Sequence, residues 1–132
     1  MAGSGGPSPT VLVIEDDAAL RQLYRYTFSM RGLRVEFAAD GLSGLLRLDE
    51  LSPAAIVLDL GLPRLSGRAV LDELIATPAR RDIPVVVVTA LDPAGLPADV
   101  LVLRKPIDPE EIVSTIRRLV RLRRRIDGSR LP

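Results

Sequence analysis

The chain has 132 residues, of which 47% are hydrophobic and 3% aromatic, and its formal net charge at pH 7 is +1. This length suits a single domain with an aliphatic core, and so small a charge argues neither for nor against a nucleic-acid partner. The chain contains no Cys and no His, which excludes disulfides, thiol chemistry and a histidine general base. No apolar run approaches the length of a membrane span, so we expect a cytoplasmic protein without a membrane partner.

Residues 1–9 are rich in Gly, Ser and Pro and lack hydrophobic periodicity, which predicts a flexible N-terminal tail. The single domain is expected over residues 10–126, followed by a short C-terminal tail over residues 127–132. Apolar runs rich in Val and Ile predict five strands within the domain. These strands are expected at residues 11–14, 33–38, 54–58, 84–89 and 100–103.

Amphipathic stretches separate the first four strands, and another follows the fifth. The predicted helices begin after Asp17, Asp40, Ser66 and Asp108, all of which are residues that favour helix N-termini. The apolar stripes of the first three helices are expected to face the core. They include the side chains of Leu20, Leu23, Tyr24, Phe28, Leu42, Leu45, Leu46, Val70, Leu71, Leu74 and Ile75.

This alternation predicts an α/β fold in which a doubly wound parallel sheet carries helices on both faces. The connection between the fourth and fifth strands is the exception. Residues 90–99 contain Pro93, Gly95 and Pro97, and a parallel crossover normally needs a dozen or more residues, usually including a helix. We therefore expect the fourth crossover helix to be missing or reduced to one turn.

Polar side chains follow four of the predicted strands. Glu15 and Asp16 follow the first, Asp59 the third, Thr89 ends the fourth, and Lys105 follows the fifth. In a doubly wound sheet these strand ends converge on one crevice. Neighbouring carboxylates repel by about 4 kcal/mol per pair at about 4 Å and an effective dielectric of about 20, so the cluster predicts a bound cation. An all-oxygen site of this kind favours Mg²⁺.

The segments VLVIEDD, IVLDLGLPRLSG, PVVVVTA and RKP, in this order, resemble the receiver domain of two-component response regulators. The resemblance covers residues 10 to about 125 and implies the flavodoxin-like strand order 2-1-3-4-5. It implies that Asp59 is the phosphoacceptor, that Asp16 and Asp59 bind Mg²⁺ directly, and that Glu15 acts through water. The Gly61 backbone carbonyl would be a further metal ligand, Thr89 the switch hydroxyl and Lys105 the partner of the phosphoryl group.

The favoured function is accordingly a phosphoacceptor signalling switch, not an enzyme in its own right. The implied partner is a sensor histidine kinase or a phosphotransfer protein, and the protein itself is expected to be a monomer or a weak homodimer. One alternative is a phosphatase or phosphotransferase with an aspartyl nucleophile, although Gly61 stands where a second acid would be needed. Another is a phosphorylation-independent interaction module with a vestigial acidic site. The Arg-rich last helix lacks interleaved aromatic residues, which favours a solvated face over a nucleic-acid contact.

Overall fold

A computed structural model describes residues 9–129, with side chains described as far as residue 125. The tail predicted over residues 1–9 therefore lies, except for Pro9, outside the described residues. The last helix continues to Ser129, past residue 126 where the domain was expected to end. The elements are β1 (Thr10–Ile14), α1 (Ala18–Met30), β2 (Arg34–Ala38), α2 (Gly41–Glu50), β3 (Ala55–Leu58), α3 (Gly67–Ala76), β4 (Val85–Thr89), β5 (Leu101–Arg104) and α4 (Pro109–Ser129).

All five strands are parallel and lie in the order β2-β1-β3-β4-β5, which confirms the predicted sheet. β1 and β3 lie in the middle, with Ile14 beside Leu58 at their carboxyl ends. Every residue of β3 is buried, because helices cover both faces of the sheet. No helix among the described residues is long and apolar enough to cross a membrane.

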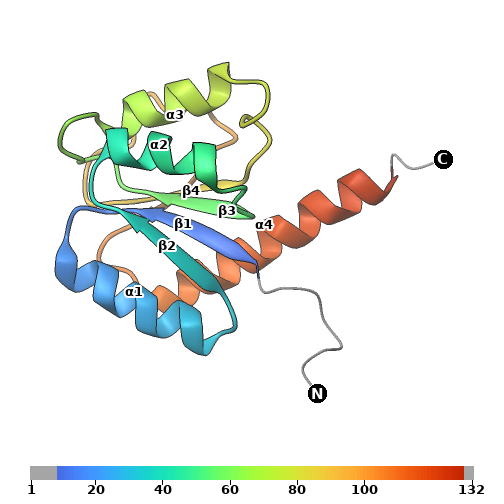
Figure 1. Cartoon of the computed structure of the whole chain (residues 1–132), viewed down its shortest axis with the longest axis horizontal. Helices are drawn as coiled ribbons and strands as arrows, with labels where there is room; N and C mark the ends of the chain where they lie inside the picture. Colours follow the sequence, from blue (N-terminus) through green and yellow to red (C-terminus); the bar gives the residue numbers. More distant parts are fainter. Residues whose placement is uncertain (1–8, 130–132) are drawn as a thin grey trace.

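The sheet separates two hydrophobic cores. On one face, α1 and α4 pack against alternate strand residues around Tyr24, Phe28 and Ile112. On the other, α2 and α3 cover Leu12, Ile14 and the remaining strand residues. Figure 1 shows the sheet between these two helical layers, with the strand tips converging on the side opposite the free end of α4.

The helices begin where the sequence predicts. Asp17, Asp40 and Ser66 each accept hydrogen bonds from backbone N–H groups in the first turn of α1, α2 and α3, respectively. Such caps satisfy N–H groups that have no partner within the helix. Asp108 likewise accepts a bond of 2.9 Å from the Glu110 N–H at the start of α4.

Four leucine and isoleucine side chains expected in the core are exposed instead. Leu42 and Leu46 are 40% and 57% exposed, because α2 packs through Gly41 and Gly44. A Cβ at Gly44 would lie 2.5 Å from Ile14 Cδ1, so this close glycine face turns both leucines outward. Leu23 and Ile75 are each 45% exposed, since Tyr24 in α1 and Leu74 in α3 occupy the inward positions beside them.

The connection between β4 and β5 contains no helix, as predicted. Residues 90–100 form turns and bends, with hydrogen bonds from the Leu96 N–H to the Pro93 carbonyl and from the Val100 N–H to the Pro97 carbonyl. Gly95 adopts a φ of 87°, which suits glycine. The chain crosses from one strand to the next without covering that edge of the sheet with a helix.

Candidate functional site

The carboxyl ends of the strands bring the predicted site residues together. β1 and β3 end side by side, so Glu15 and Asp16 follow one strand and Asp59 follows its neighbour. Backbone hydrogen bonds continue past both ends, from the Asp59 N–H to the Ile14 carbonyl (3.1 Å) and from the Glu15 N–H to the Ala38 carbonyl (3.0 Å). The sheet itself therefore fixes the backbone positions of Glu15 and Asp59, from which these carboxylates extend.

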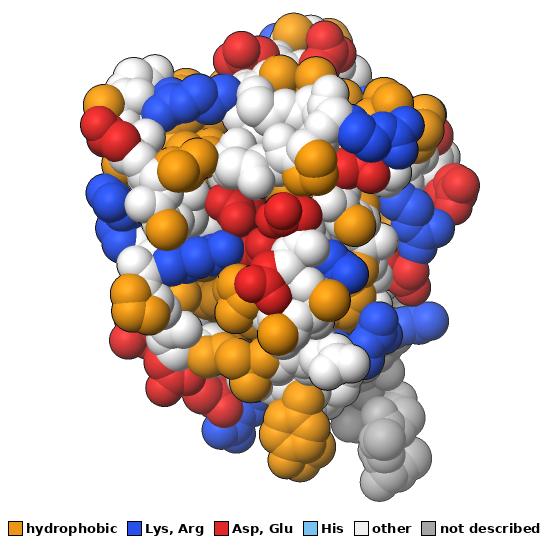
Figure 2. Space-filling model, turned by 90° about the vertical axis from the view of Figure 1, so that its left-hand side faces the viewer, with side chains coloured by type: hydrophobic (Ala, Val, Ile, Leu, Met, Phe, Trp, Pro, Cys, Tyr) orange, Lys and Arg blue, Asp and Glu red, His pale blue; other side chains and the backbone are white. Residues whose placement is uncertain are grey.

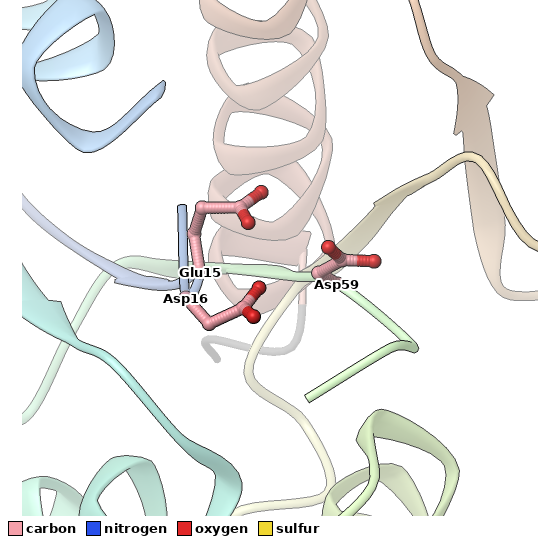
Figure 3. Close-up of side chains that lie close together, drawn as sticks. All are labelled: Glu15, Asp16 and Asp59. Carbon is pink, nitrogen blue, oxygen red and sulfur yellow. The ribbon is translucent and has the colours of Figure 1, made fainter. Parts of the chain in front are cut away.

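The three acids form one cluster. One carboxylate oxygen from each of Glu15, Asp16 and Asp59 lies within 4.8 Å of the other two. Figure 3 shows the three side chains gathered at the strand ends. In Figure 2, acidic side chains lie at the centre of the face onto which the strand ends open. Glu15 and Asp59 are only 3% and 8% exposed, whereas Asp16 is exposed to solvent.

Lys105 lies between the two buried acids. Its Nζ donates hydrogen bonds to Glu15 Oε1 at 2.7 Å and to Asp59 Oδ2 at 3.0 Å. The lysine follows β5, at the far side of the sheet from β1, and reaches back across the strand ends. One ammonium group thus compensates part of the charge of three carboxylates, and the cluster keeps a net negative charge.

Burial and Lys105 act in opposite directions on the two buried acids. For Glu15, burial raises the pKa and outweighs the hydrogen bond from Lys105, so the pKa lies above its usual range. For Asp59, burial also acts to raise the pKa, but hydrogen bonds from Lys105 and the Gly61 N–H prevail and lower it. Burial acts to lower the pKa of Lys105, and its two hydrogen bonds reverse that effect. Of the two buried acids, Asp59 is therefore the one whose ionised form the surroundings favour.

The remaining predicted residues border Asp59. Thr89 is fully buried at the end of β4, and its Oγ1 accepts a hydrogen bond of 3.1 Å from the Leu91 N–H. A hydrogen bond with Thr89 also contributes to the low pKa of Asp59. The Gly61 N–H donates to Asp59 Oδ1 at 3.2 Å. The structure thus brings all six predicted residues to one place, while the role of each of them stays a prediction.

Three supporting contacts were not predicted from the sequence. Arg21 Nη1 donates to the Glu15 carbonyl at 2.9 Å, and the Asp17 N–H donates to Glu15 Oε2 at 3.2 Å. Gly67, at the start of α3, lies directly against the Asp59 carbonyl, which a Cβ would overlap. Of these three contacts, only that of Gly67 could have been predicted from the sequence, because a glycine in the first turn of a helix indicates a close approach between the helix and a neighbouring segment.

The donor set fits a hard divalent cation. All three side chains offer oxygen, the ligand atom that Mg²⁺ prefers, and the cluster is open on the side of Asp16. Asp16 takes part in no hydrogen bond or ion pair with the described part of the chain. After the Lys105 ammonium is counted, the carboxylates of Glu15, Asp16 and Asp59 together keep two negative charges. This charge matches that of a divalent cation.

A doubly wound sheet with an acidic pocket and a lysine at its strand ends defines a class of signalling domain. The response regulator receiver domain family matches residues 11–117, and the chain belongs to this family. This match confirms the resemblance seen in the sequence. It also leaves the last turns of α4 beyond the family's boundary.

Curated relatives are full-length regulators. The chain is 35% identical over 127 residues to the "DNA-binding dual master transcriptional regulator RpaA" of Synechocystis. The aligned region covers 89% of this chain and 52% of that protein. It is 38% identical over 117 residues to "Response regulator MprA" of Mycobacterium sp. strain KMS, covering 84% of this chain and 50% of MprA. The chain thus spans about half the length of these relatives.

Solved structures show the same architecture. The receiver domain of Francisella response regulator 1452 superposes with a TM-score of 0.79 at 28% identity, covering 86% of this chain and 98% of that one. The receiver domain of sensor histidine kinase PA1611 from Pseudomonas aeruginosa gives a TM-score of 0.78 at 25% identity, with the same coverage. The latter structure has a magnesium ion coordinated in its active-site cleft.

Proposed function

We propose that this receiver domain is switched by phosphorylation of Asp59, with a divalent cation, Mg²⁺, held by Asp16 and Asp59 directly and by Glu15 through water. The observation that carries the proposal is the bridge from Lys105 to Asp59, which keeps a mostly buried aspartate ionised. An ionised carboxylate is a nucleophile, and the strand end holds it at the mouth of the acidic pocket.

The transfer itself needs no proton from Asp59. A carboxylate oxygen forms a bond to phosphorus while the bond from phosphorus to the donor's nitrogen or oxygen breaks, and the leaving group keeps that electron pair. A histidine kinase or a phosphotransfer protein would supply the phosphoryl group from phosphohistidine. This chain contains no His, so such a donor must come from a partner.

The surrounding residues would stabilise the charge that arrives. Mg²⁺, when bound, would neutralise negative charge on the phosphoryl oxygens. Lys105, which donates to Asp59 Oδ2, would contribute a second positive charge. The Thr89 hydroxyl accepts a bond from the Leu91 N–H through its oxygen, and its hydrogen, which now bonds Asp59, would turn to a phosphoryl oxygen. Positioning and charge neutralisation are the main demands of phosphoryl transfer.

Thr89 also suggests how the signal would leave the site. Its hydrogen bond with Leu91 links the pocket to the helix-free connection of residues 90–100. Turning the hydroxyl toward a phosphoryl group would alter that link and change the shape of the connection. Partner binding would change as a result, so the domain would act as a switch and not as an enzyme with a turnover product.

Intact-mass spectrometry tests the proposal. Incubation with acetyl phosphate and Mg²⁺ should add one phosphoryl group to the protein, and chelation of the metal should prevent the addition. Asp59→Asn should abolish it, whereas Asp72→Asn, a change at an exposed acid of α3, should leave it intact. Addition that persists in Asp59→Asn would place the acceptor elsewhere, and no addition at all to the wild-type protein would support the interaction module with a vestigial site.

A further inference from the structure

The helix-free connection between β4 and β5 is tied to the start of α3 by an arginine. Arg68, the second residue of α3, is partly buried, and its Nη2 donates a hydrogen bond of 2.7 Å to the Asp92 carbonyl. Its Nη1 lies 3.8 Å from the position that a Cβ on Gly95 would take. Within the described part of the chain Arg68 forms no ion pair. The connection is therefore the partner of this guanidinium.

The backbone of Arg68 is held next to the predicted phosphoacceptor. Gly67, the residue before it, lies so close to the Asp59 carbonyl that a Cβ would overlap it. The Gly67 N–H donates a hydrogen bond of 3.0 Å to the Leu60 carbonyl. The first turn of α3 therefore cannot shift without moving the end of β3. A hydrogen bond from this turn to Asp92 thus fixes the connection relative to Asp59.

Asp92 follows directly after the residue that bonds the predicted switch hydroxyl. The Leu91 N–H donates to Thr89 Oγ1 at 3.1 Å, and Thr89 also forms a hydrogen bond with Asp59. A change in the orientation of the hydroxyl at one end of this series is therefore passed to the Asp92 carbonyl at the other. The contacts close into a ring, whose members in order are Asp59, Thr89, Leu91, Asp92, Arg68 and Gly67.

We propose that Arg68 is a positioning residue that holds the connection, and through it the Thr89 hydroxyl, in the arrangement of the unphosphorylated protein. This inference rests on the proposed phosphorylation of Asp59, in which Thr89 would turn toward the phosphoryl group. Leu91 would lose or move its bond to Thr89, and the Asp92 carbonyl would then leave Arg68. A contact that is made in one state only stabilises that state. The bond from Arg68 therefore opposes the phosphorylated arrangement, and its removal makes that arrangement easier to reach.

Binding of beryllofluoride, an anionic analogue of a phosphoryl group, to the full chain with Mg²⁺ tests this role. Arg68→Ala should bind the analogue about fivefold more tightly than the wild type does, because no bond to the connection has to break. The loss of a positive charge acts by itself in the opposite direction, since it weakens the attraction for an anion. Arg68→Lys, which keeps a donor for the carbonyl, should lie closer to the wild type. Arg81→Ala removes the same charge from an exposed residue beyond α3 and should stay within about twofold of the wild type.

Hydrogen exchange of the metal-free protein gives a second readout, which does not depend on phosphorylation. The Leu91 and Ala94 amides each donate to a side-chain oxygen, and both should exchange faster in Arg68→Ala than in the wild type or in Arg81→Ala. If the wild type binds beryllofluoride and Arg68→Ala binds it equally or more weakly, or if exchange at Leu91 is unchanged, this inference is wrong while the proposed function stands. A wild-type protein that does not bind the analogue would overturn the proposed function, and this inference with it.

Discussion

Lys105 Nζ lies 3.0 Å from Asp59 Oδ2 and 2.7 Å from Glu15 Oε1, so one lysine contacts both buried acids of the pocket. It is the only lysine of the chain, beside 17 arginines. An ammonium group is compact and can direct its hydrogens to two acceptors, whereas a guanidinium is planar and larger. The space between the two carboxylates therefore suits lysine.

The first prediction concerns this choice of cation. Lys105→Arg should slow phosphorylation of Asp59 by about tenfold to a hundredfold, because the guanidinium cannot take the ammonium position beside the incoming phosphoryl group. The initial rate of the mass increase with acetyl phosphate measures the effect. Arg104→Lys, at the exposed residue before it, is the matched control and should keep the wild-type rate. Equal rates for both variants would mean that Lys105 does not contact the phosphoryl group.

The second prediction concerns metal binding. Mg²⁺ at about ten times its dissociation constant should stabilise the folded protein by about 1.4 kcal/mol, because a ligand that binds only the native state shifts unfolding. Asp16→Asn should remove most of that stabilisation and slightly raise the metal-free stability, because it removes one charge from a cluster of three acids. Thermal unfolding with Mg²⁺ and with a chelator measures both. Asp72→Asn should respond to Mg²⁺ as the wild type does, and an unaltered response in Asp16→Asn would remove Asp16 from the metal site.

Strand positions and the helix-free connection could be predicted because they depend on local signals. The four valines at residues 85–88 are typical of a buried strand. Pro93 and Pro97 disfavour a helix in any surroundings, because proline lacks a backbone N–H. The inward faces of α1, α2 and α3 were predicted less well. Leu42 and Leu46 look like core residues until Gly44 is seen to pack against Ile14, and that contact depends on how closely the helix approaches the sheet.

The site could be assembled from the sequence because parallel strands place their ends together. What the sequence could not supply is the balance of charge. Glu15 and Asp59 are both acids at strand ends, yet their pKa values move in opposite directions, because burial dominates at Glu15 and the bonds from Lys105 and Gly61 dominate at Asp59. The contact from Arg21 to the Glu15 carbonyl likewise depends on the placement of α1.

The third prediction concerns the glycine behind the phosphoacceptor. Gly67→Ala should lower the free energy of unfolding by about 3 kcal/mol, because the new Cβ would overlap the backbone of Asp59 and Leu60, which cannot move without shifting the strand end. Gly44→Ala should cost only about 1 kcal/mol, since the atom in its way is the terminal methyl of Ile14. Urea unfolding measures both values, and the same variants should differ in phosphorylation rate. A smaller loss for Gly67→Ala than for Gly44→Ala would contradict this account.

The fourth prediction concerns the connection between β4 and β5. Amide hydrogens of residues 94–98 should exchange far faster than those of β4, because the connection has turns in place of a helical hydrogen-bond ladder. The Leu96 N–H, at 3.3 Å from its acceptor, should show only weak protection. Hydrogen exchange followed by mass spectrometry resolves the two segments. Strong protection throughout residues 94–98 in the unphosphorylated protein would show a helix in solution.

The last prediction uses the two tyrosines of the chain. Tyr24 is 2% exposed beneath the pocket, and burial raises its pKa to about 12, whereas Tyr26 in the same helix is 67% exposed. A raised pKa means that folding favours the neutral phenol. The corresponding stability is complete below the unfolded value of 10.0 and is lost as the pH rises toward about 12. The difference amounts to about 3 kcal/mol across that interval.

Absorbance of the phenolate, followed while circular dichroism monitors the fold, should therefore show that Tyr24 titrates near pH 12. Tyr24→Phe should remove this titration, and Tyr26→Phe should leave it in place. Urea unfolding between pH 9 and pH 12, as approximate limits around the ordinary tyrosine pKa of about 10, should then show a smaller loss of stability in Tyr24→Phe than in the wild type or in Tyr26→Phe. If Tyr24 of the folded protein titrates near the ordinary value, it is not buried as the structure has it, and the packing of α1 beneath Lys105 must be revised.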